Sequence, residues 1–237
     1  MLNKLAIITV HSGSLKKLFL TLNSVNSQLT KPDLHLIISK EQINITNKLN
    51  FRKYIFNKDK SLYNAMNIGQ SLLRNLSFLY LNSGDLFYSK NSISIIKRYN
   101  EIYPNKCLIF KTVLKYGNLT FEPNNNFFYS NSFRQHPSFV CPGHRRKKKF
   151  NEEYSILSDG IWMESQSKRF GYKKINLKIS LLHLGGVSSN PKLVSIKECF
   201  SFSIKEGVKE LLKFFIKVIF DKKNFYKTIL QKNFILK

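Results

Sequence analysis

Short apolar runs alternate with helix-like periodicity along most of the chain, and this alternation limits the fold more than any other feature. Residues 4–10, 34–39 and 76–81 are rich in aliphatic and aromatic side chains, which is typical of buried strands. Apolar residues from Leu15 to Val25 recur at i, i+3, i+4 and i+7, which predicts one face of a helix. Further strands are expected at 51–56 and 174–182, further helices at 61–74 and 154–168, and short strands with loops between 107 and 140. This order predicts an α/β fold with a mostly parallel central sheet and helices on both faces.

The chain is strongly basic, with 39 Lys and Arg against 14 Asp and Glu and a formal net charge of +25. Three explanations are open: nucleic-acid binding, attraction to an anionic membrane surface, and a coding bias that also makes Asn, Ile, Phe and Tyr abundant. The basic residues are spread along the whole chain, and no helix-turn-helix, zinc-finger or RNA-binding motif is found. Nucleic acid is therefore not expected as a partner.

The expected location is the cytoplasm, with peripheral attachment to the inner face of the cytoplasmic membrane as an option. The apolar run at residues 5–10 is too short for a secretory signal, and no run approaches the roughly 20 residues of a membrane-spanning helix. The three cysteines, Cys107, Cys141 and Cys199, lie far apart in the sequence. This spacing excludes a disulfide scaffold and a thiolate zinc site, and it fits a reducing compartment.

Two regions are expected: a catalytic domain over residues 1–200 and a basic, amphipathic helical tail over residues 201–237. In the tail, Ile204, Val208 and Phe215 fall on one apolar face, and Lys and Glu residues fall on the opposite face. Basic flanks and a Phe-rich face suit a helix that lies in the membrane interface. Packing on the chain's own domain or on a partner subunit is the alternative.

Aspartates are few, and two of the five stand at positions suited to chemistry. Asp85 follows the expected strand at 76–81, and ligands of parallel sheets bind beyond the carboxyl ends of the strands. A carboxylate there suits a divalent cation held against phosphate oxygens, although a loop Asp that closes a turn is the alternative. Asp159 precedes Gly160 at the start of a helical pattern, where it is either a helix cap or a general base.

Several motifs in order resemble glycosyltransferase family 2, in the branch that builds bacterial surface polysaccharides such as lipopolysaccharide and capsule. The stretch Asp59-Lys60-Ser61-Leu62-Tyr63-Asn64-Ala65-Met66-Asn67-Ile68-Gly69 is followed by Leu81-Asn82-Ser83-Gly84-Asp85 at the family's spacing. Further similar elements are Gln135-His136-Pro137, residues 150–159 and Gly185-Gly186-Val187-Ser188. The resemblance covers residues 3–190.

The resemblance implies a GT-A fold and an inverting transfer of a sugar from a nucleotide-sugar donor to a saccharide acceptor that is expected to be lipid-linked. It makes Asp85 the residue that binds the diphosphate and a divalent metal, Mn²⁺ or Mg²⁺, and Asp159 the catalytic base. The donor-binding residues that it implies are Asp59, Asn64, Asn67, Asn82, Asp85 and His136. His183 is either an additional metal ligand or a structural histidine.

The sequence departs from the family pattern after the second strand. An acidic D-G-x-S-x-D stretch, which helps to hold the nucleoside, is replaced by residues 38–44, and Glu41 is the candidate substitute. Asn64 stands in place of the motif's second Asp, and Pro137 stands in place of the Gln after His136. Three hypotheses are therefore carried forward: an active glycosyltransferase, a non-catalytic GT-A domain that serves as a binding or assembly subunit, and a basic nucleic-acid-binding protein.

Overall fold

The computed structural model describes residues 4–43, 49–58, 61–73, 75–122, 136–143, 148–183 and 193–204, with residues 207, 208, 211, 212 and 215 beyond them. The strands are β1 (Leu5–His11), β2 (Leu34–Ser39), β3 (Arg52–Phe56), β4 (Ser77–Tyr80), β5 (Leu86–Phe87), β6 (Cys107–Tyr116), β7 (Leu119–Phe121), β8 (Phe139–Val140) and β9 (Tyr172–His183). The helices are α1 (Leu15–Asn26), α2 (Leu62–Ser71), α3 (Ser92–Ile102), α4 (Ser158–Phe170) and α5 (Leu193–Phe202), and His136–Ser138 form a short 3₁₀ turn, η2.

The first half of the chain forms a four-stranded parallel sheet in the order β3-β2-β1-β4. The expected strands at 4–10, 34–39, 51–56 and 76–81 are confirmed within one or two residues at each end. All seven residues of β1 are buried, because this strand has a neighbour on each side and helices above and below. Ligands of parallel sheets bind beyond the carboxyl ends of the strands, so ligand-binding loops are expected where β1, β2 and β4 end.

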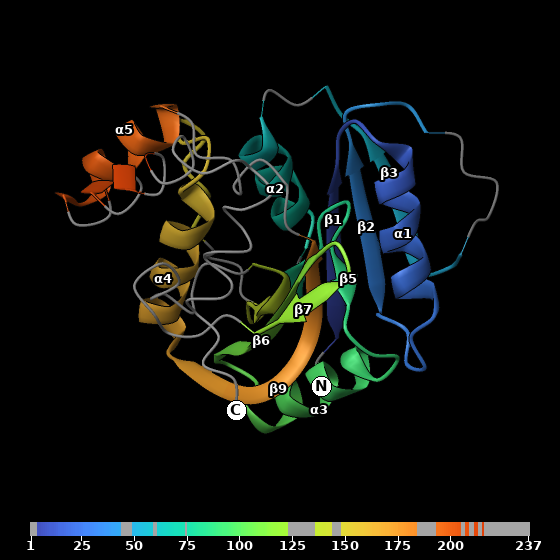
Figure 1. Ribbon diagram of the computed structural model, residues 1–237. Coiled ribbons are helices and arrows are strands. Elements are labelled where there is room, and N and C mark those ends of the chain that lie inside the picture. The colour runs from blue at the N-terminus through green and yellow to red at the C-terminus, as the bar shows by residue number, and fades with distance from the viewer. Residues whose placement is uncertain are drawn as a thin grey trace.

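Helices cover both faces of the parallel sheet, as predicted. Alternate residues of a strand point to opposite faces. Ala6, Ile8 and Val10 of β1 pack in one cluster with residues of α2 and α4, and Leu5 and Ile7 pack in another with residues of α1 and α3. Figure 1 shows α1 and α2 on opposite sides of β1 and β2.

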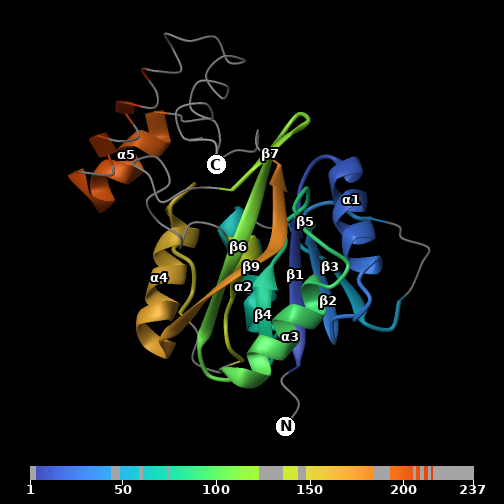
Figure 2. The ribbon, with the colours of Figure 1, turned by 60° about the horizontal axis from the view of Figure 1, so that its bottom comes forward.

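A second, mixed sheet has the order β5-β9-β6-β7, with β8 paired to β6. The long strands β6 and β9 run parallel and side by side, as Figure 2 shows. Main-chain hydrogen bonds between Phe78 and Cys141, at 2.8 and 2.9 Å, join this sheet to β4. The strand expected at 174–182 is confirmed as part of β9, whereas the ten-residue β6 is longer than the short strands expected between 107 and 140.

A buried polar network links β1, β2 and β3. The Thr9 hydroxyl donates to Leu81 O at 2.8 Å, so its oxygen accepts from His35 Nε2–H at 2.9 Å. This leaves a lone pair on His35 Nδ1, which accepts from Arg52 Nε at 3.3 Å. The Arg52 guanidinium also donates to Asn26 Oδ1 at 2.6 Å. The network therefore fixes His35 as the neutral tautomer that carries its proton on Nε2.

The division into residues 1–200 and 201–237 stays a prediction. In the part of the chain that the structure describes, no helix has the length and apolar character needed to cross a bilayer. The apolar residues Ile204, Val208, Leu212 and Phe215, which follow α5, are 43–77% exposed.

Candidate active site

The loop that carries Asp85 lies at the carboxyl end of β4 and is held by α1. Asp85 N donates to Asn82 O at 2.8 Å, and Gly84 adopts a φ of +103°, a conformation that favours glycine. The Thr21 hydroxyl accepts from Gly84 N at 2.9 Å and donates to Asp85 O at 2.9 Å. The Asp85 side chain is only 10% exposed, and its Oδ2 accepts from Asn82 N at 3.2 Å. The loop is therefore fixed in place before any ligand binds.

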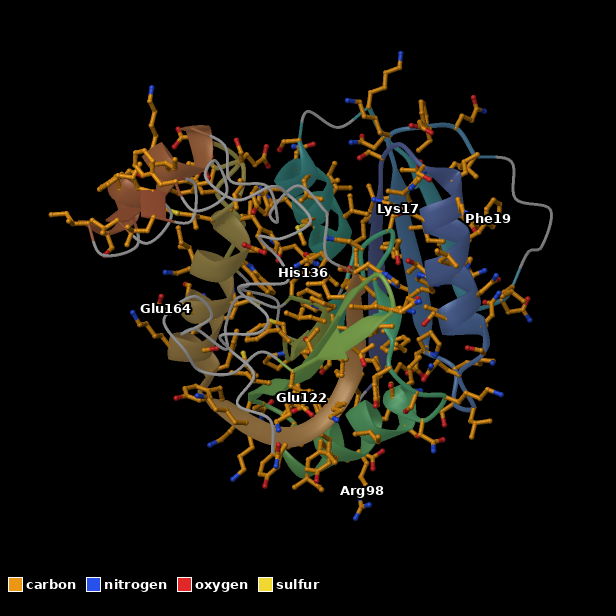
Figure 3. The ribbon with its side chains drawn as sticks, viewed as in Figure 1. Lys17, Phe19, Arg98, Glu122, His136 and Glu164 are labelled. Carbon is orange, nitrogen blue, oxygen red and sulfur yellow. The ribbon has the colours of Figure 1, made fainter. Side chains whose placement is uncertain are left out.

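His136 brings Asp85 and Asp159 together. Its Nε2 lies 3.2 Å from Asp85 Oδ2, and its Nδ1 lies 3.5 Å from Asp159 Oδ2. Asn82 Nδ2 lies 3.2 Å from the same Nε2. Figure 3 shows His136 in the middle of the molecule, between α4 and the parallel sheet. Three residues that the family resemblance singled out thus come together from the loop after β4, from η2 and from α4.

The two carboxylates determine the charge of His136. Burial lowers the pKa of His136, but hydrogen bonds to Asp159 and Asp85 and their negative charges outweigh this effect and raise the pKa to about 9. At neutral pH the imidazole is therefore protonated. An imidazolium between two carboxylates reduces their mutual repulsion and holds both in one orientation.

Asp159 occupies the first turn of α4, with a side chain 23% exposed. The N-cap position is Leu157, so Asp159 is not the cap residue that sequence reasoning left as its alternative role. Its Oδ1 accepts from Gly160 N at 2.8 Å and lies 3.5 Å from the Tyr63 hydroxyl. Burial and the charge of Asp159 raise the pKa of Tyr63, so this hydroxyl keeps its proton and can donate it to the carboxylate.

The two asparagines of α2 face the segment that precedes α4. Asn64 and Asn67 donate to the two oxygens of Glu152 at 2.9 and 2.8 Å. Asn67 also donates to Phe150 O at 3.0 Å and accepts from Phe150 N at 2.8 Å. The expected donor-binding role of both asparagines stays a prediction. Sequence reasoning missed Glu152 as their partner, because no side-chain pattern relates residues that lie so far apart.

Glu41 supplies a carboxylate where the family's acidic stretch is missing. Its Oε1 accepts from Gly13 N at 3.0 Å, which links the turn after β1 to the turn after β2. Ser39 fixes this second turn, because its hydroxyl donates to Glu41 O and accepts from Glu41 N. At the end of β1, His11 Nδ1 lies 3.0 Å from the Ser83 hydroxyl. Expected site elements outside the described residues are Asp59, Gln135 and Gly185-Gly186-Val187-Ser188.

A divalent metal fits this site only if substrate oxygens share it. Among the described residues, no three His, Cys, Asp or Glu side chains gather closely enough to hold a metal ion by themselves. Asp85 Oδ2 is engaged by Asn82 and His136, and within the same residues Oδ1 makes no hydrogen bond, so it is the oxygen that can face a cation. Mg²⁺ is commonly bound by one or two carboxylates together with substrate phosphates, and Asp85 suits that mode.

His183 lies at the end of β9, beside Lys115 of β6. Burial and the charge of Lys115 lower the pKa of His183, whereas Asp85 raises it. Asp85 is therefore close enough to His183 to affect its pKa, and the charge of Lys17 lowers the same pKa. Cationic and acidic groups thus lie close enough to Asp85 and His183 to influence each other's charge.

Comparison with known proteins identifies the fold. No family model and no curated protein sequence matches the chain. The crystal structure of residues 1–349 of TarS from S. aureus matches with a TM-score of 0.66 and 13% identity, over 94% of this chain and 74% of that one. The same TarS fragment matches in complex with UDP, at TM-score 0.61 and 14% identity over 94% and 74% of the two chains. Its complex with UDP-GlcNAc matches at TM-score 0.64 and 15% identity, over 94% and 75%. The chain therefore has the α/β fold of GT-A-like glycosyltransferase structures, as the sequence predicted.

Proposed function

We propose that this protein is an inverting glycosyltransferase that takes a sugar from a nucleotide-sugar donor and adds it to a saccharide acceptor. The observation that carries the proposal is the meeting of Asp85 and Asp159 on His136 at the carboxyl edge of the parallel sheet. This edge is where α/β folds bind nucleotides. Support comes from TarS, which has the same fold and whose structures include complexes with UDP and UDP-GlcNAc.

The two carboxylates suit different steps of one displacement. Asp159 accepts the proton of an acceptor hydroxyl, and the oxygen attacks the anomeric carbon while the bond from that carbon to the diphosphate oxygen breaks. The electron pair leaves with the nucleoside diphosphate on the side of Asp85. Asp85 would hold a Mn²⁺ or Mg²⁺ ion, which would supply positive charge to the departing diphosphate. Attack and departure on opposite sides invert the anomeric centre.

The nucleoside side of the donor is assigned to the loops after β1 and β2. Glu41, on the loop after β2, accepts a hydrogen bond from Gly13 N on the loop after β1. It is the carboxylate that we assign to the nucleoside in place of the acidic stretch that this sequence lacks. The donor residues Asn82 and His136 adjoin Asp85 directly. Asp59, Asn64 and Asn67 are assigned to the donor by the family resemblance.

The first experiment is calorimetric titration with UDP, GDP and dTDP, each with and without Mn²⁺. One nucleotide is expected to bind in a metal-dependent way, and Asp85→Asn is expected to weaken that binding at least tenfold, because the neutral amide is a poorer ligand for the cation. Glu164→Gln is the matched control: this carboxylate lies on α4 in an ion pair with Lys168, on the outer side of the molecule in Figure 3. Failure of all three nucleotides to bind would favour the non-catalytic GT-A domain.

The second experiment separates binding from chemistry. Asp159→Asn is expected to keep nucleotide affinity and to lower sugar transfer by about 10²–10⁴-fold, the usual contribution of a general base. The readout is release of nucleoside diphosphate from the donor in the presence of a bacterial lipid extract, with product anomers identified by NMR. Full activity of Asp159→Asn, or retention of the donor's anomeric configuration, would contradict the proposed mechanism.

The acceptor is proposed to be a lipid-linked saccharide at the cytoplasmic face of the inner membrane, in the synthesis of lipopolysaccharide, capsule or a similar polymer. Ile204 is 77% exposed, and Val208, Leu212 and Phe215 follow at helical spacing with 43–52% exposed. The lysines of the same segment would complement an anionic lipid surface.

Vesicle flotation tests this attachment. The protein is expected to float with phosphatidylglycerol vesicles and not with phosphatidylcholine vesicles, and the double variant Ile204→Asp, Phe215→Asp is expected to stay at the bottom. Leu29→Asp is the control, because Leu29 is an equally exposed apolar residue outside this segment, with 72% exposed. Equal flotation of both variants would assign the interaction to general positive charge.

A further inference from the structure

A carboxylate from the C-terminal helix holds the main chain immediately before α4. Both oxygens of Glu198, which lies on α5, accept from backbone N–H groups of three consecutive residues. The distances are 2.5 Å to Ser155 N, 3.0 Å to Ile156 N and 3.4 Å to Leu157 N. These donors belong to Leu157, the N-cap residue of α4, and to the two residues before it, whose N–H groups are not part of the helix's own hydrogen bonds. Glu198 therefore fixes the main chain where it enters α4, whereas inside the first turn Asp159 Oδ1 accepts from Gly160 N.

The environment of Glu198 indicates that these contacts are specific. Glu198 is only 9% exposed, and burying a carboxylate costs free energy unless hydrogen bonds compensate its lost hydration. Within the described part of the chain, no Lys, Arg or His forms an ion pair with it, so the peptide N–H groups and the positive end of α4 compensate its charge. Its charge also reaches Tyr63, the hydroxyl neighbour of Asp159.

The held segment ends two residues before Asp159. Sequence periodicity predicts a helix from residue 154, but α4 begins at Ser158, after the residues that Glu198 binds. The position of the first turn of α4, and with it the Asp159 carboxylate, thus depends on where Glu198 fixes Leu157. A displacement of about 1 Å in a reacting group can cost about 10²-fold in rate.

We propose that Glu198 is a positioning residue that sets the place of Asp159 for proton abstraction, and this inference rests on the proposed function. Within the described residues, the hydrogen bonds of the Glu198 side chain go to residues 155–157, whereas the Asp85 loop is held by Thr21 of α1. The Asp85 loop and the segment before Asp159 are therefore held by side chains of different helices, α1 and α5, and His136 contacts both carboxylates. Loss of Glu198 is expected to affect chemistry and to leave donor binding intact.

The test compares Glu198→Gln with Glu198→Asp and with Ser201→Ala, a control on α5 whose hydroxyl donates to Glu198 O. In Glu198→Gln an amide N–H would face backbone N–H groups, so at least one contact is lost. This variant is expected to lower kcat by about 10²-fold while KM for the donor and Kd for the nucleotide stay within twofold. Glu198→Asp, which keeps the charge on a shorter side chain, is expected to fall between wild type and Glu198→Gln.

Hydrogen exchange of the 155–159 amides supplies a readout independent of activity. These amides are expected to exchange faster in Glu198→Gln and to be unchanged in Ser201→Ala. Unchanged kcat in Glu198→Gln would show that Glu198 has no role in catalysis. A fall in kcat accompanied by falls in nucleotide affinity and melting temperature would show that its role is merely structural. Absence of transfer by the wild-type protein would instead refute the proposed function, and unchanged exchange in Glu198→Gln would refute the positioning of the segment separately.

Discussion

Acidification is expected to destabilise this protein through His35, which is fully buried in β2. Burial and the nearby charge of Arg52 lower the pKa of His35 from 6.5 to about 3. The hydrogen bonds give the same direction: Nε2 already donates to Thr9, so an added proton must go on Nδ1, directly against the Arg52 guanidinium. The folded protein therefore resists a proton that the unfolded chain binds readily.

The size of the effect follows from the two pKa values. Because the folded pKa is lowered, the stabilisation is complete above about pH 6.5 and is lost as the pH falls toward 3. Each pH unit below 6.5 removes about 1.4 kcal/mol, so the change from pH 7 to pH 5 removes about 2 kcal/mol. Small domains are stable by only about 5–15 kcal/mol, so this loss is large enough to measure.

The assay is urea unfolding at pH 5, 6, 7 and 8 of the wild type and of His35→Gln. Glutamine can donate to Thr9 and accept from Arg52, but it cannot be protonated in this range. The difference in unfolding free energy between the two proteins removes the contributions of groups that titrate in both. One such group is His136, whose raised pKa makes its protonation stabilise the fold as the pH falls, opposite to the effect of His35. The wild type is expected to lose about 2 kcal/mol more than the variant between pH 7 and 5. Parallel pH dependences would refute this account of His35.

Three further substitutions test packing and hydrogen bonding around the site. Gly69→Ala is expected to lower the free energy of unfolding by about 1–2 kcal/mol in urea titrations, because the new methyl group would lie 2.8 Å from Ile8 Cγ2 and overpacking outweighs the gain in helix propensity. Asn67→Ala removes the side chain that pairs with buried main-chain groups, and the same titration is expected to show a loss of about 1–3 kcal/mol. Tyr63→Phe removes the hydroxyl next to Asp159 and is expected to lower the transfer rate by roughly fivefold at unchanged melting temperature. A melting temperature that falls with the rate would make Tyr63 a packing residue instead.

Much of the fold could be predicted because its parallel strands are buried on both faces. The segments that became β1, β2 and β4 are nearly continuous apolar runs, and such runs are distinctive in sequence. The two-residue strands β5 and β8 exist only because β9 and β6 pair with them, so no local pattern indicates them. The late start of α4 has the same kind of cause, because its preceding residues bond to a distant side chain.

The candidate site also has parts that the sequence indicates and parts that only the packing of the chain determines. Asp85, His136 and Asp159 lie in short motifs, so their types and order could be recognised in the sequence. Their meeting could not be predicted, because it depends on how β4, η2 and α4 pack together. Glu198 was missed for a different reason: its partners are backbone N–H groups, and a glutamate in a helical pattern ordinarily faces solvent.

The chain has a single tryptophan, and its place makes it a built-in optical probe of the candidate site. Trp162 lies one turn of α4 after Asp159, is 3% exposed, and stacks on Phe150 with ring centroids 4.5 Å apart. Its indole N–H donates to Lys148 O at 2.7 Å. Indole emission reports the polarity and quenching groups around the ring, so the tryptophan fluorescence of this protein, excited apart from that of its 11 tyrosines, comes from the helix that carries the proposed base. Ligand binding and movement of α4 can therefore be followed in the unlabelled protein, in real time and without a coupled reaction.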